Sequence, residues 1–127
     1  MYSLFVLFII SVSMSDMYNI EAAKIIHCNS PSWSKSNGIA DLQKSVENCF
    51  KIADKEHIKS IALPSIGSGN AGWPKQLAAE TILRAIERYF QTIMASSIKN
   101  VYFVLYDQDS VDIYTSELKK LLEHSYD

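Results

Sequence analysis

The chain has 127 residues, which suits one domain with a substantial core. Hydrophobic residues make up 48% and charged residues 20%, and this balance excludes a disordered or fibrous chain. Twelve Lys and Arg face fourteen Asp and Glu, and both excess acids, Asp16 and Glu21, precede residue 24. The remaining chain is neutral and lacks the clustered basic footprint of DNA- or RNA-binding proteins, so no direct nucleic-acid binding is expected.

The first residues differ from the rest of the chain. Residues 4–10 form an unbroken apolar run, and no Lys or Arg occurs before residue 24. The run is far shorter than the ~20 residues that span a bilayer. Its length suits the apolar region of a secretory signal, but the basic start is missing. Residues 1–22 are interpreted as an unrelated apolar leader; the alternatives are a buried strand or a working signal peptide, which would make the protein secreted.

Regular elements follow in chain order. Residues 23–28 read as a short buried strand, and a helix is expected from Ile39 to about His57 because apolar residues recur at helical spacing. Residues 60–63 form a second strand, Pro74 opens a second helix, residues 100–106 form a third strand, and a last helix follows. The apolar positions of the three helices are Leu42, Val46, Cys49, Phe50 and Ala53; Ala78, Ile82, Leu83, Ile86, Phe90 and Ile93; and Val111, Tyr114, Leu118 and Leu121.

This alternation of strands and helices predicts an α/β fold with a mixed, largely parallel sheet and right-handed crossovers. Three predicted strands are few for such a sheet, so we expect the sheet to be incomplete. Two cysteines and three scattered histidines do not make a metal site, and Cys28 and Cys49 are expected to be free thiols.

A glycine-rich loop, residues 64–74, joins the second strand to the second helix. Gly67, Gly69 and Gly72 permit close approach of a ligand to the main chain, and the amides before Pro74 can form a concave nest at the helix N-terminus. A diphosphate suits such a nest, although a tight turn is the simpler alternative. The glycine spacing also fits a dinucleotide-binding fingerprint, but Pro74 is tolerated only in the first helical turn, which places Gly72 in the loop.

Several separate motifs follow one another beyond residue 23, at residues 26–33, 61–69, 72–76, 96–99 and 101–107. Together these motifs resemble macro domains, with variants typical of the macro-histone branch. The resemblance covers residues 23–122, which makes residues 23–127 similar to the C-terminal portion of a macro domain.

The resemblance implies a three-layer α/β/α fold and a nuclear, chromatin-associated module that binds ADP-ribose or an ADP-ribosylated protein. The residues that match the family's diphosphate loop are Ile66, Gly67, Ser68, Gly69 and Asn70, and Phe103 matches an adenine-pocket aromatic. The alternative for Phe103 is a core strand residue. No cofactor is expected.

The resemblance also limits the expected activity. The adenine-recognising Asp and the catalytic residues of the family's hydrolases belong to the first half of the domain, which residues 1–22 do not match. We therefore expect no enzymatic activity, and ADP-ribose binding weakened to millimolar affinity at best. The alternatives are a fragment of a dinucleotide-binding, Rossmann-like enzyme, and a remnant of the fold that acts only through protein contacts.

Overall fold

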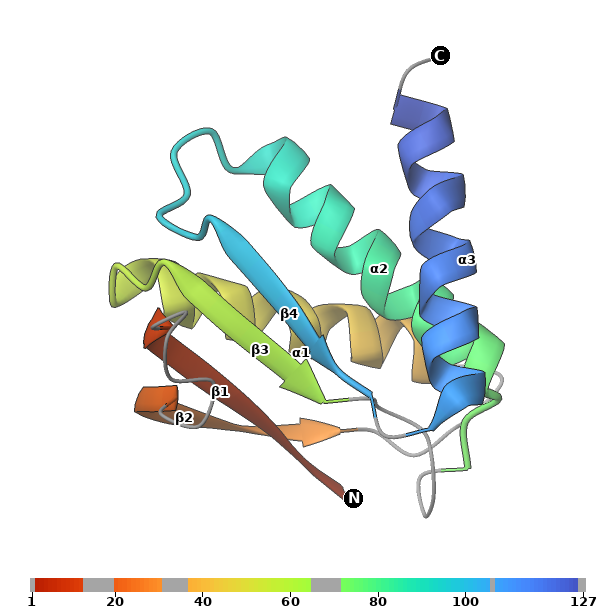
Figure 1. Ribbon diagram of the computed structural model, residues 1–127, viewed down its shortest axis with the longest axis horizontal. Helices are drawn as coiled ribbons and strands as arrows, with labels where there is room; N and C mark the ends of the chain where they lie inside the picture. The colour runs from red at the N-terminus through yellow and green to blue at the C-terminus, as the bar shows by residue number, and fades with distance from the viewer. Residues whose placement is uncertain (1, 13–19, 31–36, 65–71, 106, 126–127) are drawn as a thin grey trace.

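The computed structural model describes residues 2–12, 20–30, 37–64, 72–105 and 107–125, the first two segments by their backbone alone. These residues form four strands and three helices, which alternate in the second part of the chain (Figure 1). They are β1 (Tyr2–Val12), β2 (Ile20–Ser30), α1 (Gly38–Lys55), β3 (Ser60–Pro64), α2 (Lys75–Thr92), β4 (Asn100–Val104) and α3 (Gln108–Ser125).

The strands form one mixed sheet in the order β2-β1-β3-β4. β1 is antiparallel to both β2 and β3, whereas β3 and β4 are parallel, with Ser60 opposite Asn100 and Pro64 opposite Val104. A parallel pair needs a crossover connection, and α2 supplies it. β3, α2 and β4 therefore form a single strand–helix–strand unit, to which α3 is attached.

The ends of the helices follow from local residue chemistry. Pro74 precedes α2 in an extended conformation, and its carbonyl accepts the amide of Ala78 at 3.0 Å. α1 stops before His57, whose φ of 56° is left-handed, and the chain then turns so that the amide of Ile58 donates to the carbonyl of Ala53 at 3.0 Å. A left-handed residue after the last turn is a common helix terminator.

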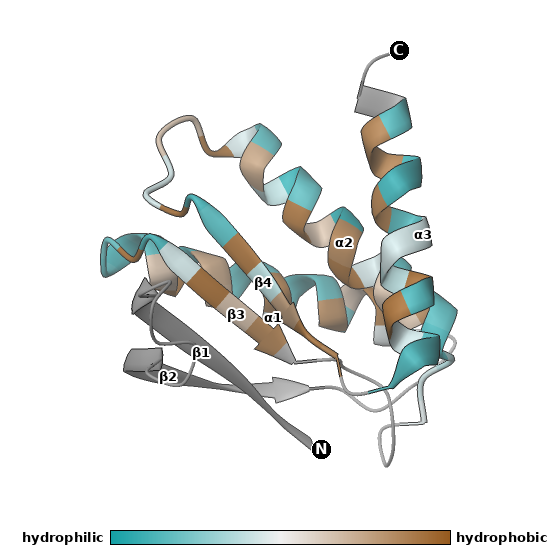
Figure 2. Cartoon of the chain, viewed as in Figure 1, coloured by the Kyte–Doolittle hydropathy of each residue, from teal (hydrophilic) through white to brown (hydrophobic). Residues whose placement is uncertain are grey.

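The core lies between the sheet and the helices. Ile61 and Leu63 of β3 are fully buried, and Val101 and Phe103 of β4 pack partly buried on the same cluster. Apolar side chains of α1 and α2 join the same cluster, and Figure 2 shows how hydrophobic positions alternate with hydrophilic ones along α2. The predicted inward positions of α1 are confirmed, since each is fully buried: Leu42, Val46, Cys49, Phe50 and Ala53.

The α/β fold with a mixed sheet is confirmed, and three details differ from expectation. In the described residues, all three helices join clusters on the face of the sheet that carries Phe103, so a third layer is not seen there. The third predicted strand ends at Val104 instead of residue 106. Cys49 is disulfide-bonded, so the expectation of a free thiol is wrong; sequence separation does not reveal which sulfurs folding brings together.

The apolar run near the N-terminus forms part of the sheet. Residues 2–12 form β1, which lies between β2 and β3, and Leu7 pairs with Ala62. The leader therefore lies inside the sheet, as the alternative of a strand anticipates, while its boundary at residue 22 remains a prediction. None of the three described helices combines the length and the apolar composition that a membrane span requires.

Candidate functional site

The carboxyl ends of the parallel strands define the candidate site. β3 ends at Pro64 and β4 at Val104, and α2 and α3 begin a few residues beyond these ends, at Lys75 and Gln108. Both helices therefore start at the same edge of the sheet (Figure 1). Ligands of open α/β sheets bind outside the carboxyl ends of the strands, and helix N-termini favour anions.

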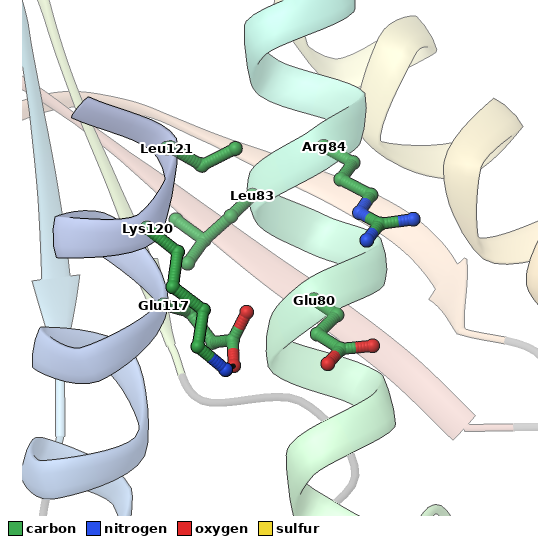
Figure 3. Close-up of a pocket in the computed structure, with 6 residues that line it drawn as sticks. All are labelled: Glu80, Leu83, Arg84, Glu117, Lys120 and Leu121. Atoms are coloured by element: carbon green, nitrogen blue, oxygen red, sulfur yellow. Dashed lines mark hydrogen bonds and ion pairs between the residues drawn. The ribbon is translucent and has the colours of Figure 1, made fainter. Parts of the chain in front are cut away.

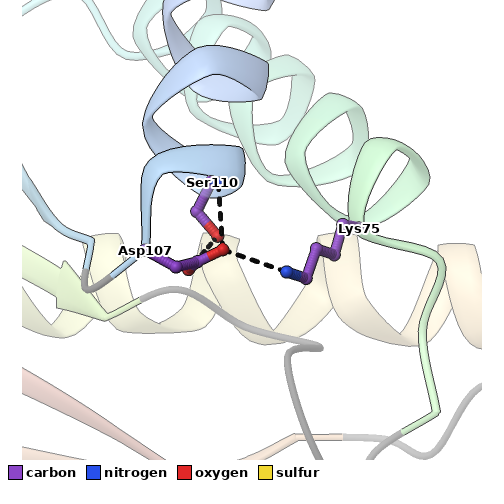
Figure 4. A network of polar contacts seen from close by, with 3 residues as sticks. All are labelled: Lys75, Asp107 and Ser110. Carbon is purple, nitrogen blue, oxygen red and sulfur yellow. Dashed lines mark hydrogen bonds and ion pairs between the residues drawn. The ribbon is translucent and has the colours of Figure 1, made fainter.

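A polar network joins the starts of the two helices (Figure 4). The Lys75 ammonium donates to Asp107 Oδ2 at 3.0 Å. Asp107 also caps α3: the Ser110 hydroxyl donates to its Oδ1 at 2.7 Å, and the Ser110 amide donates to its Oδ2 at 3.2 Å. An acceptor at this position satisfies amides that the first helical turn leaves unpaired. The network thus ties the start of α2 to the cap of α3.

The same contacts control the protonation of both charged groups. Hydrogen bonds from Ser110 and then from Lys75 lower the pKa of Asp107 to about 2. In return, the hydrogen bond to Asp107 and its charge raise the pKa of Lys75. Both groups are charged at neutral pH, and they form a half-exposed ion pair at the edge of the site.

Replacing Ser110 with alanine is expected to raise the pKa of Asp107 from about 2 toward 3.8, because the hydroxyl makes the largest contribution to the lowering. Replacing Lys75 with methionine should raise this pKa as well. A carboxyl-carbon NMR titration measures both changes, with Asp112→Asn on the exposed part of α3 as the control. An unchanged Asp107 pKa in both variants would contradict the network.

Phe103 lies near the carboxyl end of β4 and is partly buried. Its ring contacts Tyr114 of α3, with centroids 5.1 Å apart, in a cluster with Ala79 and Leu83 of α2. Phe103 therefore supports the packing of both helices whose starts border the site. Its contact with an adenine remains a prediction.

Replacing Tyr114 with phenylalanine is expected to stabilise the protein. The Tyr114 hydroxyl is buried without a hydrogen-bond partner in the described part of the chain, and burial raises the pKa of this group to about 12. Removing an unsatisfied buried hydroxyl should recover up to ~1 kcal/mol, or a few degrees in Tm. Thermal unfolding followed by circular dichroism tests this, with Tyr102→Phe, at an exposed position, as the matched control. Destabilisation by Tyr114→Phe alone would contradict the expectation.

The predicted diphosphate loop, Ile66, Gly67, Ser68, Gly69 and Asn70, lies outside the described residues. Gly72, the first described residue after this loop, has a φ of 74° and open space where a Cβ would stand. Gly72 lies before Pro74 and α2, as the sequence predicts. A dinucleotide-binding fingerprint would require this glycine inside the helix, so that alternative is wrong.

A second polar feature, which the sequence analysis missed, lies between α2 and α3 (Figure 3). Glu117 is buried, and it accepts hydrogen bonds from Gln76 and, at 3.2 Å, from Lys120. It lines a small hollow together with Glu80 and Arg84 of α2. Both contacts satisfy the buried carboxylate, and the one from Gln76 joins α3 to α2, which gives Glu117 a structural role.

Asp107 was also missed as a functional position, although the sequence contains a signal. An Asp three residues before a Ser at the start of an apolar helical pattern is typical of a helix cap. Within the described segments, no group of three His, Cys, Asp or Glu residues is placed to hold a metal ion.

The strand–helix–strand–helix unit and the paired helix starts at its carboxyl edge define an α/β module with a candidate ligand site at that edge. The Macro domain family model matches residues 11–82, and the chain belongs to the macro domain family.

Curated relatives support this assignment. Histone macroH2A1.1 of Capsaspora owczarzaki is 49% identical over 102 residues, which cover 80% of this chain and 28% of the histone. O-acetyl-ADP-ribose deacetylase 1 of Pantoea vagans is 32% identical, over 76% of this chain and 56% of the enzyme. The chain thus spans little more than half of this enzyme and a smaller part of the histone.

Solved structures show the same fold. A mutant Oceanobacillus iheyensis macrodomain with ADPR superimposes with a TM-score of 0.70 at 26% identity, covering 79% of this chain and 54% of the other. The same macrodomain with ADP gives a TM-score of 0.61.

The relatives also correct one expectation. The sequence analysis excluded enzymatic activity, yet several matching relatives are named O-acetyl-ADP-ribose deacetylase, including those of Pantoea vagans and Salmonella typhimurium at 32% and 30% identity. The exclusion is therefore wrong: it rested on catalytic residues of the family's hydrolases that residues 1–22 do not match, whereas relatives named as enzymes match three quarters of this chain.

Proposed function

We propose that this chain binds ADP-ribose at the carboxyl edge of β3 and β4. The observation that carries the proposal is the meeting of two helix starts, at Lys75 and Gln108, beyond the ends of a parallel strand pair. This arrangement suits an anionic ligand. The similarity to an Oceanobacillus iheyensis macrodomain solved with ADPR supports ADP-ribose as that ligand.

The roles of individual residues belong to the same proposal. The diphosphate is bound by the main chain of residues 66–70, because consecutive amides in a glycine-rich loop form an anion-binding nest. Phe103 supplies an apolar wall for the adenine, which its incomplete burial near the end of β4 permits. The neutral body of the chain leaves nucleic acid outside the set of ligands.

The setting of this activity is proposed to be chromatin in the nucleus. The support is the identity of 49% to a histone macroH2A1.1, a higher identity than the 32% to a bacterial deacetylase. A module of this kind would recognise ADP-ribose on chromatin proteins rather than contact DNA.

Hydrolysis of O-acetyl-ADP-ribose is the second candidate function. It is supported by the relatives with that name, which match three quarters of this chain. Its substrate belongs to the same ligand class as ADP-ribose. The two candidate functions therefore share the binding step, and only hydrolysis releases acetate.

The binding step is tested by calorimetric titration of the whole chain with ADP-ribose. We expect a Kd of millimolar order, near −4 kcal/mol. Gly69→Glu should abolish the heat of binding, because a side chain and a negative charge would occupy the anion nest. Asn48→Glu adds the same charge to the exposed surface of α1 and is the matched control. Equal binding by both variants would contradict the proposed site.

The two candidates are separated by a second measurement. The chain is incubated with O-acetyl-ADP-ribose, and free acetate is followed by proton NMR. Acetate release that Gly69→Glu abolishes and Asn48→Glu retains would support the deacetylase activity. Binding without release would leave ADP-ribose recognition as the function.

A further inference from the structure

We propose that Lys75 determines the charge preference of the candidate site: its ammonium offsets the carboxylates at the start of α3, so that an anionic ligand can bind at the start of α2. This inference rests on the proposed binding of ADP-ribose at the same edge of the sheet. It adds the residue that makes this edge accept a diphosphate.

The starts of α2 and α3 differ in what their amides contact. The amide of Ser110, in the first turn of α3, donates to Asp107 Oδ2 at 3.2 Å. α2 follows Pro74, and within the described residues no side chain caps this start and no acidic residue lies in its first turn. The amides of a first helical turn have no partner within the helix. The start of α2 is therefore open to an anion, whereas the start of α3 already contacts a carboxylate.

Two carboxylates lie close to the start of α2. Asp107 has 42% of its side chain exposed, and Asp109 lies in the first turn of α3. Glu80 and Glu117 lie further along their helices, where Gln76 donates a hydrogen bond to each of them. The two aspartates alone would repel an anionic ligand that approached α2, because like charges interact even at a partly solvated surface.

Lys75 supplies the compensating charge. Its ammonium donates to Asp107 Oδ2 at 3.0 Å (Figure 4), and its side chain is 43% exposed. The hydrogen bond to Asp107, the charge of Asp107 and the charge of Asp109 raise the pKa of Lys75, so its positive charge acts on both carboxylates. An ammonium has three donors, and in the described part of the chain this ion pair uses one. Two N–H groups are left to contact a phosphate oxygen.

A role in charge and a role in structure predict different effects. An exposed ion pair contributes little to stability, since solvent screens it. If the pair only held α2 against α3, loss of either partner would disturb the site in the same way. If Lys75 sets the charge that a ligand meets, loss of the ammonium and loss of the carboxylate change the affinity in opposite directions.

The test measures binding of ADP-ribose to the whole chain and its variants by NMR chemical-shift titration at low ionic strength. Lys75→Met should weaken binding about fivefold and Asp107→Asn should strengthen it about threefold, because the two changes remove opposite charges. Asparagine also caps helices, so α3 keeps its cap. The double variant should bind within about twofold of the wild type, because the lost charges cancel. Lys51→Met removes an exposed cation near the end of α1 and, as the matched control, should not alter binding.

The two roles predict opposite results for Asp107→Asn. Weaker binding by both single variants would show a structural tie and overturn the charge role of Lys75. Unchanged binding by Lys75→Met would overturn it as well, while binding of ADP-ribose by the wild type would leave the proposed function standing. Absence of binding by the wild type would contradict both proposals.

Salt provides a second readout that a structural role would not change. The loss of affinity in Lys75→Met should shrink as salt is raised, because the Debye length falls to about 8 Å at physiological ionic strength and further above it. A loss of the same size at high salt would contradict the electrostatic origin of the effect.

Discussion

Replacing Phe50 with alanine is expected to lower the free energy of unfolding by about 3–5 kcal/mol. Phe50 is fully buried in α1. Its ring lies edge-on to two rings of α2, with centroids 5.4 Å from Tyr89 and 5.7 Å from Phe90. Such ring pairs add to the energy of area burial. Removing the ring opens a cavity between the two helices that carry most of the core.

Urea unfolding followed by circular dichroism measures this effect. A domain of this size is stable by about 5–15 kcal/mol, so the loss would shift the midpoint strongly or unfold the protein. Ile52→Ala is the control on the same helix, at a position that is 42% exposed, and should change stability by less than ~1 kcal/mol. Similar losses for the two variants would show that Phe50 is not a central core residue.

Asp54→Asn is expected to cost about 2–3 kcal/mol. The Asp54 carboxylate accepts hydrogen bonds from the hydroxyl of Tyr89, from the hydroxyl of Ser96 at 2.9 Å, and from the amide and hydroxyl of Ser97 at 2.7 and 3.0 Å. These contacts join the end of α1 to α2 and to the connection before β4. The side-chain NH₂ group of asparagine would face some of these hydrogen-bond donors, and a donor cannot accept their hydrogen bonds.

The effect of Asp54 should depend on pH. Burial acts to raise the pKa of Asp54, but the hydrogen bonds from Tyr89, Ser97 and Ser96 outweigh it, and the pKa lies below 3.8. A lowered folded-state pKa contributes stability above about pH 4, which is lost as the pH falls through that lowered value. The difference in the free energy of unfolding between wild type and Asp54→Asn should therefore be largest at pH 7 and should decrease as the pH falls.

Urea unfolding at pH 7 and at decreasing pH checks this prediction. Glu123→Gln, which removes an exposed carboxylate from α3, provides the control and should leave both the midpoint and its pH dependence nearly unchanged. A stability difference that stays constant between pH 7 and pH 3 would exclude the carboxylate as its source.

The helical part of the fold could be predicted from the sequence because each helix buries one face. The spacing of Leu42, Val46 and Phe50 determines which side of α1 turns inward, and the structure buries all three residues. β1 was harder to assign, since its place depends on pairing with Ala62 far along the chain. An apolar run carries no information about its partner in a sheet.

The candidate site shows the same division. The glycine-rich loop pointed to the start of α2 as a candidate site, although a tight turn before a helix would use the same residues. The ion pair between Lys75 and Asp107 joins residues from two elements, and only the parallel packing of β3 and β4 brings them to 3.0 Å. Neither composition nor local residue spacing could predict this ion pair.

The sheet order has a consequence for the kinetics of folding. Ser60 and Asn100 meet across one helical crossover, whereas Leu7 and Ala62 close a longer loop that contains β2 and α1. Loop closure costs more conformational entropy as the interval grows, and distant pairings form slowly. We expect the β3–α2–β4 unit to condense first and β1 to insert beside β3 in a later step. Until that step, both edges of the parallel pair are open, and the rate of insertion sets the interval during which the nascent chain is most prone to aggregate.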